Sequence, residues 1–378
     1  MKLLYITNIP TPYRQSRFNL LSKILQENGI KLEVLYMAQI ESNRNWTIPI
    51  DSFQYNYKIY KGIHPTFGGM FAHFNPGLLI RLLKNDYKYA IIGGMSSPTH
   101  LLAPFFIQKD KTKVMSVESN LFSVKRTKGL AAWLKKILLK KVDAYQVTGT
   151  PQINYIKYFI GNFNKPIIKL PNLIDDKIFS EKILKIKINK TKLRSELEIA
   201  DNNQVWIIPA RLHQEKGLIE FLEVLKDVDN FKDVKIFILG TGPLETKIRD
   251  YVSIHNLPVT LVGFVQQDIA IKYYAISDLF VLPSLKDPSP LTPIEACAAS
   301  LPLLVSNRIG NLEDVLADNG WSYDPKDSKE NLIKLFNEVI KMSNSDLSKV
   351  GVISKSIYNQ KFNNLRCLNY YVKSIIKL

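Results

Sequence analysis

Residues 279–307 read LFVLPSLKDPSPLTPIEACAASLPLLVSN and contain a complete strand–helix–strand unit. The run LFVLPS at the start and the run PLLVSN at the end have the length and composition of buried strands. Residues around 291–299 lie between them and are predicted to form a helix. Two buried strands joined by a helix are typical of a parallel sheet with helices on both faces.

The same alternation runs through both halves of the 378-residue chain. Further strands are predicted at KLLYIT, KLEVLYM, YAIIGG, KVMSVES and AYQVTGT, and then at VWIIPA, VKIFILG and VTLVGF. Further helices are predicted around 14–28, from Pro98, and around 129–141, 216–227, 243–255, 267–276 and 355–377. The sequence therefore predicts an α/β protein with two Rossmann-like domains.

The boundary between the domains is predicted at LPNLIDDKIF, residues 170–179, which a lysine-rich stretch follows. The expected division is an N-terminal domain over 1–172, a C-terminal domain over 173–354 and a last segment over 355–378. That last segment is helical and lies beyond the last clear strand. We therefore expect it to cross back onto the first domain.

The composition excludes several classes of protein. Apolar residues make up 46% and charged residues 22%, which are the values of a globular chain and not of a disordered one. The apolar stretches, such as LLAPFFI at 101–107, are far shorter than the roughly 20 residues that span a bilayer. We expect no signal peptide, and Cys297 and Cys367 predict neither a disulfide framework nor a metal site. The expectation is a cytoplasmic protein without metal or cofactor.

The positive charge is concentrated in the first half of the chain. Residues 1–172 hold 24 lysines and arginines against 8 acidic residues, whereas the rest holds 27 against 26, and the whole chain has a net charge of +17. An excess of this size predicts an anionic partner: nucleic acid, a membrane surface or a phosphorylated acceptor. No nucleic-acid-binding motif occurs in the sequence, so we expect no nucleic acid partner.

Two stretches of the second half have the features of a phosphate site. IIPARLHQEKG places Arg211 and Lys216 in the loop and first turn after a strand, and ILGTGPLE places Gly240 and Gly242 between a strand and a helix. A glycine turn lets backbone N–H groups approach a phosphate, and fixed cations neutralise a departing diphosphate without a metal. The alternatives are a solvated surface pair of cations and an ordinary turn.

The quoted segment also contains two carboxylates, Asp287 and Glu295. They are eight positions apart, with a loop and a helix start between them. Carboxylates bind polyols well, since they accept several charge-assisted hydrogen bonds. The pair therefore suits the hydroxyl groups of one sugar and one ribose. The alternatives are a turn residue at Asp287 and, at Glu295, a charge favoured by the helix dipole.

These stretches, together with LVGFV, resemble in order and approximate spacing the donor-binding half of the GT-B glycosyltransferases of family 4, over about residues 200–325. The resemblance implies two Rossmann-like domains that face each other across a cleft. It also implies transfer of a hexose-type sugar from a nucleotide-sugar, with retention of configuration and without a metal. The donor-side roles that it implies are Arg211 and Lys216 on the diphosphate with Gly240 and Gly242 beside them, Asp287 against the sugar, Glu295 on the ribose, and Gly263 and Phe264 at the base.

One position departs from the family pattern, which has Glu where this chain has Asp287 followed by Pro288-Ser289-Pro290. The departure leaves two alternatives open: a sugar-nucleotide epimerase on the same fold, and a donor-binding protein without turnover. The expected partners are a UDP-sugar in preference to a GDP-sugar, and a glycan or polyprenyl-diphosphate-linked acceptor. The expected setting is bacterial surface polysaccharide or glycolipid synthesis.

The candidates for the acceptor side lie in the first half. TNIPTPYRQSRFN, residues 7–19, is a strand-to-helix loop that has two prolines and no glycine, so it is stiff and does not cradle a dinucleotide. Tyr13 offers a face for stacking on a sugar, and Arg14 reaches a phosphate; the alternatives are a packed tyrosine and a surface charge. Strand ends in open α/β sheets face the ligand crevice. Glu118 and Asn120, in the stretch SVESN at the end of a predicted strand, are therefore candidates for binding the acceptor there. The acceptor-side set is Tyr13, Arg14, His73, Glu118 and Asn120.

The predicted helix GLAAWLKKILLKK, residues 129–141, is basic and amphipathic. It has one face of Leu130, Leu134, Ile137 and Leu138, with Trp133 at the border and Lys135, Lys136 and Lys140 off that face. Either this helix lies on an anionic membrane, or it packs on the core with its lysines in water. The basic first half favours the membrane, so we expect a peripheral location at the inner face of the cell membrane.

Overall fold

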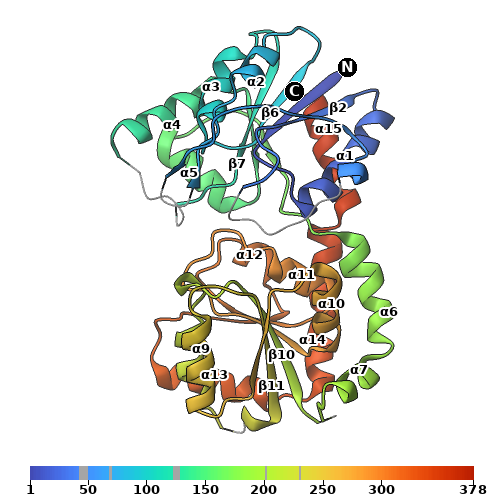
Figure 1. Ribbon diagram of the computed structural model, residues 1–378, viewed down its shortest axis with the longest axis vertical. Coiled ribbons are helices and arrows are strands. Elements are labelled where there is room, and N and C mark those ends of the chain that lie inside the picture. The colour runs from blue at the N-terminus through green and yellow to red at the C-terminus, as the bar shows by residue number, and fades with distance from the viewer. Residues whose placement is uncertain (42–49, 68–69, 122–127, 201, 230) are drawn as a thin grey trace. The chain divides into compact units, whose positions relative to one another are not determined.

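The computed structural model divides the chain into two units. Unit 1 consists of Met1–Leu173 and Asn364–Leu378, and unit 2 of Ile174–Asn363. Each unit is built around one large parallel sheet with helices on both faces (Figure 1), so the predicted α/β class with two Rossmann-like domains is confirmed. The residues that the structure describes are 1–41, 50–67, 70–121, 128–200, 202–229 and 231–378.

The sheet of unit 1 has seven strands in the order β3-β2-β1-β6-β7-β8-β9. The chain therefore starts in the middle, extends the sheet to one edge and then returns to the other side of β1. The central strands are short apolar runs with every residue or nearly every residue buried, as parallel strands between two helical layers require. Their bounds are β1 Lys2–Thr7, β2 Lys31–Tyr36, β3 Asn56–Ile59, β6 Tyr89–Ile92, β7 Thr112–Val117, β8 Ala144–Val147 and β9 Ile167–Lys169.

Two groups of helices cover this sheet. The group on one face is α2 Pro76–Arg81, α3 Pro98–Phe106, α4 Gly129–Lys141 and α5 Thr150–Ile160, and the pair on the other face is α1 Pro12–Glu27 and α15 Asn364–Ile376. Thr11 is the N-cap of α1 and accepts a hydrogen bond from the N–H of Arg14 at 3.4 Å. A capping threonine followed by proline starts a helix without a glycine turn. A short antiparallel hairpin, β4 Thr66–Phe67 and β5 Met70–Phe71, lies outside the large sheet.

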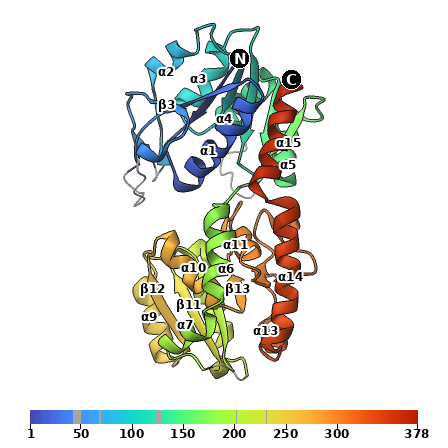
Figure 2. The same cartoon turned by 90° about the vertical axis from the view of Figure 1, so that its right-hand side faces the viewer.

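Helix α15 completes the core of unit 1, beside α1 (Figure 2). Its buried apolar side chains are Leu368, Tyr371, Val372 and Ile375. The Tyr371 hydroxyl donates to Gln146 Oε1 at 2.8 Å, and the Gln146 amide donates to Ser116 Oγ at 3.0 Å. The expectation that the last helix crosses back to the first domain is therefore confirmed.

The helix predicted over 355–377 is in fact two helices. Helix α14, Asn344–Lys361, belongs to unit 2, and α15 begins at Asn364. Phe362 is the C-cap of α14 and leaves the helical conformation at φ −126°, while its ring is buried. Burial of this ring accompanies the end of α14, which a helical pattern alone does not reveal.

Unit 2 repeats the architecture with six strands in the order β12-β11-β10-β13-β14-β15. The order reverses between β10 and β13. The strands are β10 Gln204–Pro209, β11 Val234–Leu239, β12 Val259–Gly263, β13 Leu279–Leu282, β14 Leu303–Ser306 and β15 Gly320–Tyr323. Helices α8 Leu218–Leu225, α9 Glu245–Ile254 and α13 Lys329–Ile340 pack on one face, and α10 Gln267–Ile276, α11 Thr292–Ala298, α12 Leu312–Val315 and α14 lie on the other side of the sheet.

The lysine-rich stretch after the boundary docks on unit 2. It forms a π-helical turn and the short helices α6 Ile183–Lys187 and α7 Lys190–Glu196. The Asp278 carboxylate pairs with Arg194 and, at 2.7 Å, with Lys190. Asp278 also accepts from the N–H of Val205 at 2.9 Å, so these helices are fixed to the start of β13 and β10.

Candidate functional site

Two of the predicted donor-side residues meet in unit 2, where the strand order reverses. Lys216 lies in the 3₁₀ turn Gln214–Lys216 before α8, and Asp287 lies in the loop between β13 and α11. The Lys216 ammonium donates to the Asp287 carboxylate, and the two side chains are only 13% and 11% exposed. The carboxyl ends of strands at such a reversal are where open α/β sheets bind ligands. The pair is therefore a nearly buried charge pair at the ligand edge of the sheet.

Backbone contacts hold both partners of this pair. Gly217 has φ +65°, and a Cβ atom there would lie 2.2 Å from the carbonyl oxygen of Pro283. Only glycine fits this close approach between the loops after β10 and β13. The N–H of Asp287 donates to Arg308 O at 3.1 Å, and its carbonyl accepts from the N–H of Gly310 at 2.8 Å.

The predicted glycine turn packs against the loop that carries Arg211. A Cβ atom on Gly240 would lie 2.1 Å from the carbonyl oxygen of Ala210, and one on Gly242 would lie 2.5 Å from that of Leu212. The N–H of Leu244 donates to the Leu212 carbonyl at 3.0 Å. These contacts explain why the turn has glycines: the two loops touch backbone to backbone.

The same contacts correct the predicted helix start. Helix α9 begins at Glu245 and not at 243, so Pro243 lies in the turn before the helix rather than in its first turn. The N–H of Gly240 donates to the carbonyl of Gly263 at 2.8 Å, which joins the turn to the end of β12. Phe264 follows with about half of its surface exposed.

Gly240→Ala is expected to lower the free energy of unfolding more than Gly263→Ala. Both glycines have positive φ, +146° and +83°, but a Cβ atom on Gly263 meets no atom within 4 Å. Gly263→Ala should cost about 1–2 kcal/mol for the backbone conformation alone. Gly240→Ala should cost about 1–3 kcal/mol more, because a backbone oxygen must move. Urea unfolding of the two variants measures the difference, and equal midpoints would contradict the close approach.

Arg211 and Lys216 occupy different environments. The Arg211 side chain is 62% exposed and forms only a surface pair, Nη2 to Glu215 Oε1 at 3.2 Å. Such a pair contributes little to stability. For Arg211 the structure agrees with a solvated cation beside the glycine turn, whereas Lys216 is fixed by Asp287.

Glu295 is the fourth residue of α11, in its first turn where the helix dipole favours a negative charge, and it is buried. The buried hydroxyl of Tyr274 donates to Glu295 Oε2 at 2.5 Å. Two residues later, burial raises the pKa of the Cys297 thiol to about 12. Cys297 is therefore protonated at neutral pH and is not a nucleophile.

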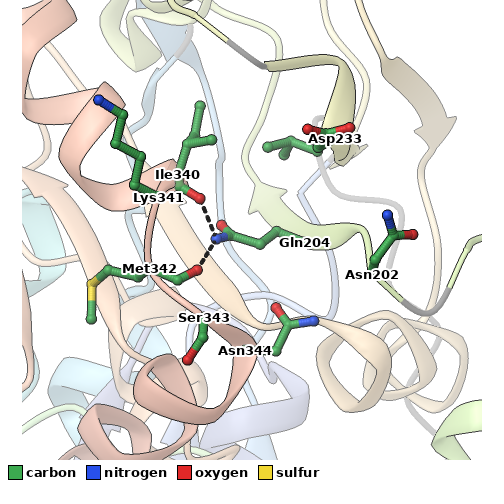
Figure 3. A pocket seen from close by; sticks show the side chains of 9 residues that line it. Asn202, Gln204, Asp233, Ile340, Lys341, Met342, Ser343 and Asn344 are labelled. Atoms are coloured by element: carbon green, nitrogen blue, oxygen red, sulfur yellow. Dashed lines mark hydrogen bonds between the residues drawn. The ribbon is translucent and has the colours of Figure 1, made fainter.

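One hollow of unit 2, about 440 Å³, lies away from these residues at the amino ends of β10 and β11 (Figure 3). Gln204 crosses it and donates to the carbonyls of Ile340 and Met342 at 2.8 and 2.7 Å. Its Oε1 accepts from the Trp206 indole N–H at 3.0 Å, so the side chain is fully used in closing the end of α13. We assign this hollow a structural role.

The acceptor-side candidates of unit 1 divide into two sets. Arg14, in the first turn of α1, donates to Thr7 Oγ1 at 2.8 Å and lies 3.5 Å from Glu118 Oε1, so these residues meet at the carboxyl ends of β1 and β7. Asn120 is buried and Tyr13 is half-buried. His73 is fully buried, and its ring contacts Glu41 and His64. Sequence reasoning missed Glu41 and His64, since no pattern links residues at these separations.

The buried residues of helix α4, Leu138 and Leu139, lie in its last turns. Leu130, Trp133 and Leu134, the α4 apolar patch, are 71%, 57% and 37% exposed. Lys136 and Lys140 are exposed, but Lys135 lies with its ammonium 5.3 Å from the ring centre of Phe159, so we leave it out of the patch. In the described part of the chain, no helix has the length and apolarity that crossing a bilayer requires. Over the same residues, no three His, Cys, Asp or Glu side chains gather as metal ligands.

Comparison with known proteins agrees with this geometry. Residues 189–350 match the family described as glycosyl transferases group 1. An uncharacterised glycosyltransferase of Methanocaldococcus jannaschii is 28% identical over 139 residues, which cover 35% of this chain and 35% of the relative. The alpha-monoglucosyldiacylglycerol synthase of Acholeplasma laidlawii is 26% identical over 190 residues, which cover 49% and 47%.

The whole fold matches a solved structure, the HepE protein of Anabaena in complex with UDP and glucose. The TM-score is 0.73 at 16% identity, and the match covers 100% of both chains. At this identity the likeness establishes the fold, which is GT-B. The chain spans about a third to a half of the length of the two curated relatives above. The chain therefore has a GT-B fold, and its residues 189–350 are similar to the glycosyl transferases group 1 family.

Proposed function

We propose that this protein is a glycosyltransferase that moves a hexose-type sugar from a nucleotide-sugar to a glycan or lipid-linked acceptor, with retention of configuration. The observation that carries the proposal is the Lys216–Asp287 pair, nearly buried at the reversal of the strand order. The glycine turn and Arg211 surround the same edge of the sheet. A cation, a carboxylate and bare backbone suit a sugar joined to a diphosphate.

The proposed reaction needs no protein nucleophile. The acceptor hydroxyl attacks the anomeric carbon on the face from which the diphosphate leaves. The bond from that carbon to the phosphate oxygen breaks, a bond to the acceptor oxygen forms, and the acceptor proton passes to the departing phosphate oxygen. Lys216 and Arg211 stabilise the charge that develops on the diphosphate, which is the electrostatic contribution on which such transfers depend. Glu295 holds the ribose hydroxyls, and we propose that no metal takes part.

The donor is proposed to be a UDP-sugar, since the HepE protein binds UDP and glucose. The acceptor is proposed to be a glycan or a lipid-linked sugar, because the Acholeplasma relative is named for a glucosyldiacylglycerol product. The setting that we propose is bacterial surface polysaccharide or glycolipid synthesis at the inner face of the cell membrane.

A panel of radiolabelled UDP- and GDP-sugars tests the proposal, with water and membrane lipid extracts as acceptors and with EDTA added in parallel. The expected result is release of UDP from at least one UDP-sugar, undiminished by EDTA. Conversion of the donor sugar into its epimer, or binding without release of UDP, would contradict transfer. Loss of activity with EDTA would contradict the metal-free reaction alone.

The α4 apolar patch is proposed to contact the membrane. Exposed leucine and tryptophan beside the exposed Lys136 and Lys140 is the combination that binds an anionic interface. Each basic residue near such a surface contributes about 1 kcal/mol, so the basic half of the chain adds to the apolar contacts.

The triple substitution Leu130→Ser, Trp133→Ser and Leu134→Ser is expected to weaken binding to vesicles that contain phosphatidylglycerol by more than tenfold. Transfer of one exposed leucine or tryptophan into the interface contributes on the order of 1–2 kcal/mol. Co-sedimentation with vesicles measures the binding. Ile254→Ser, an exposed apolar position of unit 2, is the control and should bind as the wild type does. Equal binding of the triple variant would show that the contact lies elsewhere.

A further inference from the structure

Three side chains of unit 1 form a hydrogen-bonded row that the proposed reaction does not use. Nε2 of His73 lies 2.9 Å from Glu41 Oε1, and Nδ1 of His73 lies 2.9 Å from Nδ1 of His64. His73 is fully buried and Glu41 is nearly so, whereas His64 is half-buried. The row therefore runs from a buried carboxylate to a ring that reaches the surface.

The row lies near the carboxyl edge of the unit 1 sheet. The carbonyl of His73 accepts hydrogen bonds from the N–H and the hydroxyl of Thr99, both at 3.1 Å. Thr99 is in the first turn of α3, the helix that follows β6. The order of this sheet reverses between β1 and β6, so the row adjoins the edge at which such sheets bind ligands.

The carboxylate determines which nitrogen of each ring carries a proton. An ionised carboxylate only accepts, so Nε2 of His73 must be the protonated nitrogen that donates to Glu41. In a neutral His73, Nδ1 is then the acceptor, and the proton between the two rings must belong to Nδ1 of His64. The remaining nitrogen of His64, Nε2, is left with a lone pair.

That nitrogen is available to a ligand. Among the residues that the structure describes, Nε2 of His64 has no hydrogen-bond partner. Burial, together with the positive charge of His73 when it is protonated, lowers the pKa of His64 below its usual value of 6.5, which favours the neutral ring at pH 7. A neutral imidazole nitrogen held in one orientation is a directional acceptor for a hydroxyl group.

We propose that Nε2 of His64 accepts a hydrogen bond from a hydroxyl group of the acceptor sugar, and that His73 and Glu41 are positioning residues for it. This inference rests on the proposed glycosyltransferase function. It assigns substrate recognition to unit 1 and leaves the donor chemistry to unit 2.

The tautomer is tested first, by ¹⁵N NMR of histidine-labelled protein at pH 7, with the His64 signals identified by their loss in His64→Gln. The expected spectrum has Nδ1 of His64 protonated and Nε2 unprotonated, and Glu41→Gln should abolish this preference. Protonation of Nε2 of His64 in the wild type, or no effect of Glu41→Gln on the tautomer, would overturn the proposed order of protons along the row. This readout does not depend on activity.

Substrate contact is tested by transfer from the active UDP-sugar to a panel of n-octyl hexosides. His64→Phe should raise the KM for the octyl hexoside about five- to tenfold, the effect of one lost hydrogen bond. The KM for the UDP-sugar and the rate at which water hydrolyses the UDP-sugar should not change. His64→Gln, whose amide oxygen also accepts, should restore most of the loss, and the half-buried His255→Phe of unit 2 is the matched control.

Each other outcome has one meaning. Equal loss of hydrolysis and transfer in His64→Phe would indicate a structural role and overturn the inference, as would an unchanged KM. If the wild type hydrolyses its donor but transfers sugar to no octyl hexoside, the proposal that His64 binds a hydroxyl group of an acceptor sugar is overturned. Absence of any donor turnover in the wild type would refute the proposed function instead. The NMR result on the hydrogen-bonded row does not depend on that outcome.

Discussion

Lys216→Met should lower the turnover of the nucleotide-sugar by about 10²- to 10³-fold, which is the usual effect of removing one fixed group that stabilises developing charge. Lys216 is held by Asp287 in a nearly buried site before any ligand arrives, so no reorganisation is needed when the diphosphate departs. The rate of UDP release at saturating donor measures the effect. Lys216→Arg keeps the charge and should retain more activity than Lys216→Met.

The same substitution affects stability, and the two effects are separable. Loss of one partner leaves the Asp287 carboxylate buried and unpaired, which should cost about 3 kcal/mol of unfolding free energy. The double variant Lys216→Met with Asp287→Asn removes that unpaired charge, so it should recover stability but not turnover. Lys329→Met, which breaks the exposed pair with Asp227, is the control and should change neither quantity appreciably. Wild-type turnover in a folded Lys216→Met variant would refute the assigned role.

The second large effect is expected in α15. Leu368→Ala should lower the free energy of unfolding of unit 1 by about 2–5 kcal/mol, because the side chain is wholly buried in the core. Leu365 lies on the same helix with about half of its surface exposed. Leu365→Ala should change the free energy of unfolding by less than about 0.5 kcal/mol. Hydrogen exchange of the strands of unit 1, read by mass spectrometry, measures the two variants.

Removal of residues 364–378 should unfold unit 1 altogether. Four buried apolar side chains leave with this segment, Leu368 among them, whereas a whole domain is stable by only about 5–15 kcal/mol. Unit 2 retains its own core and should still show a UDP-dependent rise in Tm. Wild-type exchange in the strands of the truncated chain would contradict the contribution of α15.

The sequence predicts the central strands of both large sheets and the edge strand β12, and it misses the other edge strands. All ten predicted strands exist: nine have mostly buried apolar runs, whereas the tenth, β12, is partly buried at the edge of its sheet. The missed strands of the two large sheets, β3, β9 and β15, lie at sheet edges, where one side of the backbone has no partner and the residues are partly polar or exposed. Runs such as NYKI and GWSY alternate over only four residues, which is the shortest length at which alternation indicates a strand.

The candidate site divides in the same way. The sequence predicts Lys216 and Asp287 separately, each from its own motif. Their pairing depends on the reversal of strand order, which brings together residues 71 positions apart and which no local pattern contains. Glu41, His64 and His73 are separated by loops whose path follows from packing alone. The residues of a glycine turn are therefore predictable from sequence, whereas contacts between distant loops are not.

The split composition of unit 1 has a consequence for biosynthesis. Residues 364–378 leave the ribosome only after all of unit 2 has been made, so until α15 arrives the β-sheet encoded first has one face covered by α1 alone. Unit 2 is continuous in sequence and can mature meanwhile. The domain translated first is therefore completed last, and a nascent chain that stalls within unit 2 displays exposed apolar surface that chaperones and proteases recognise.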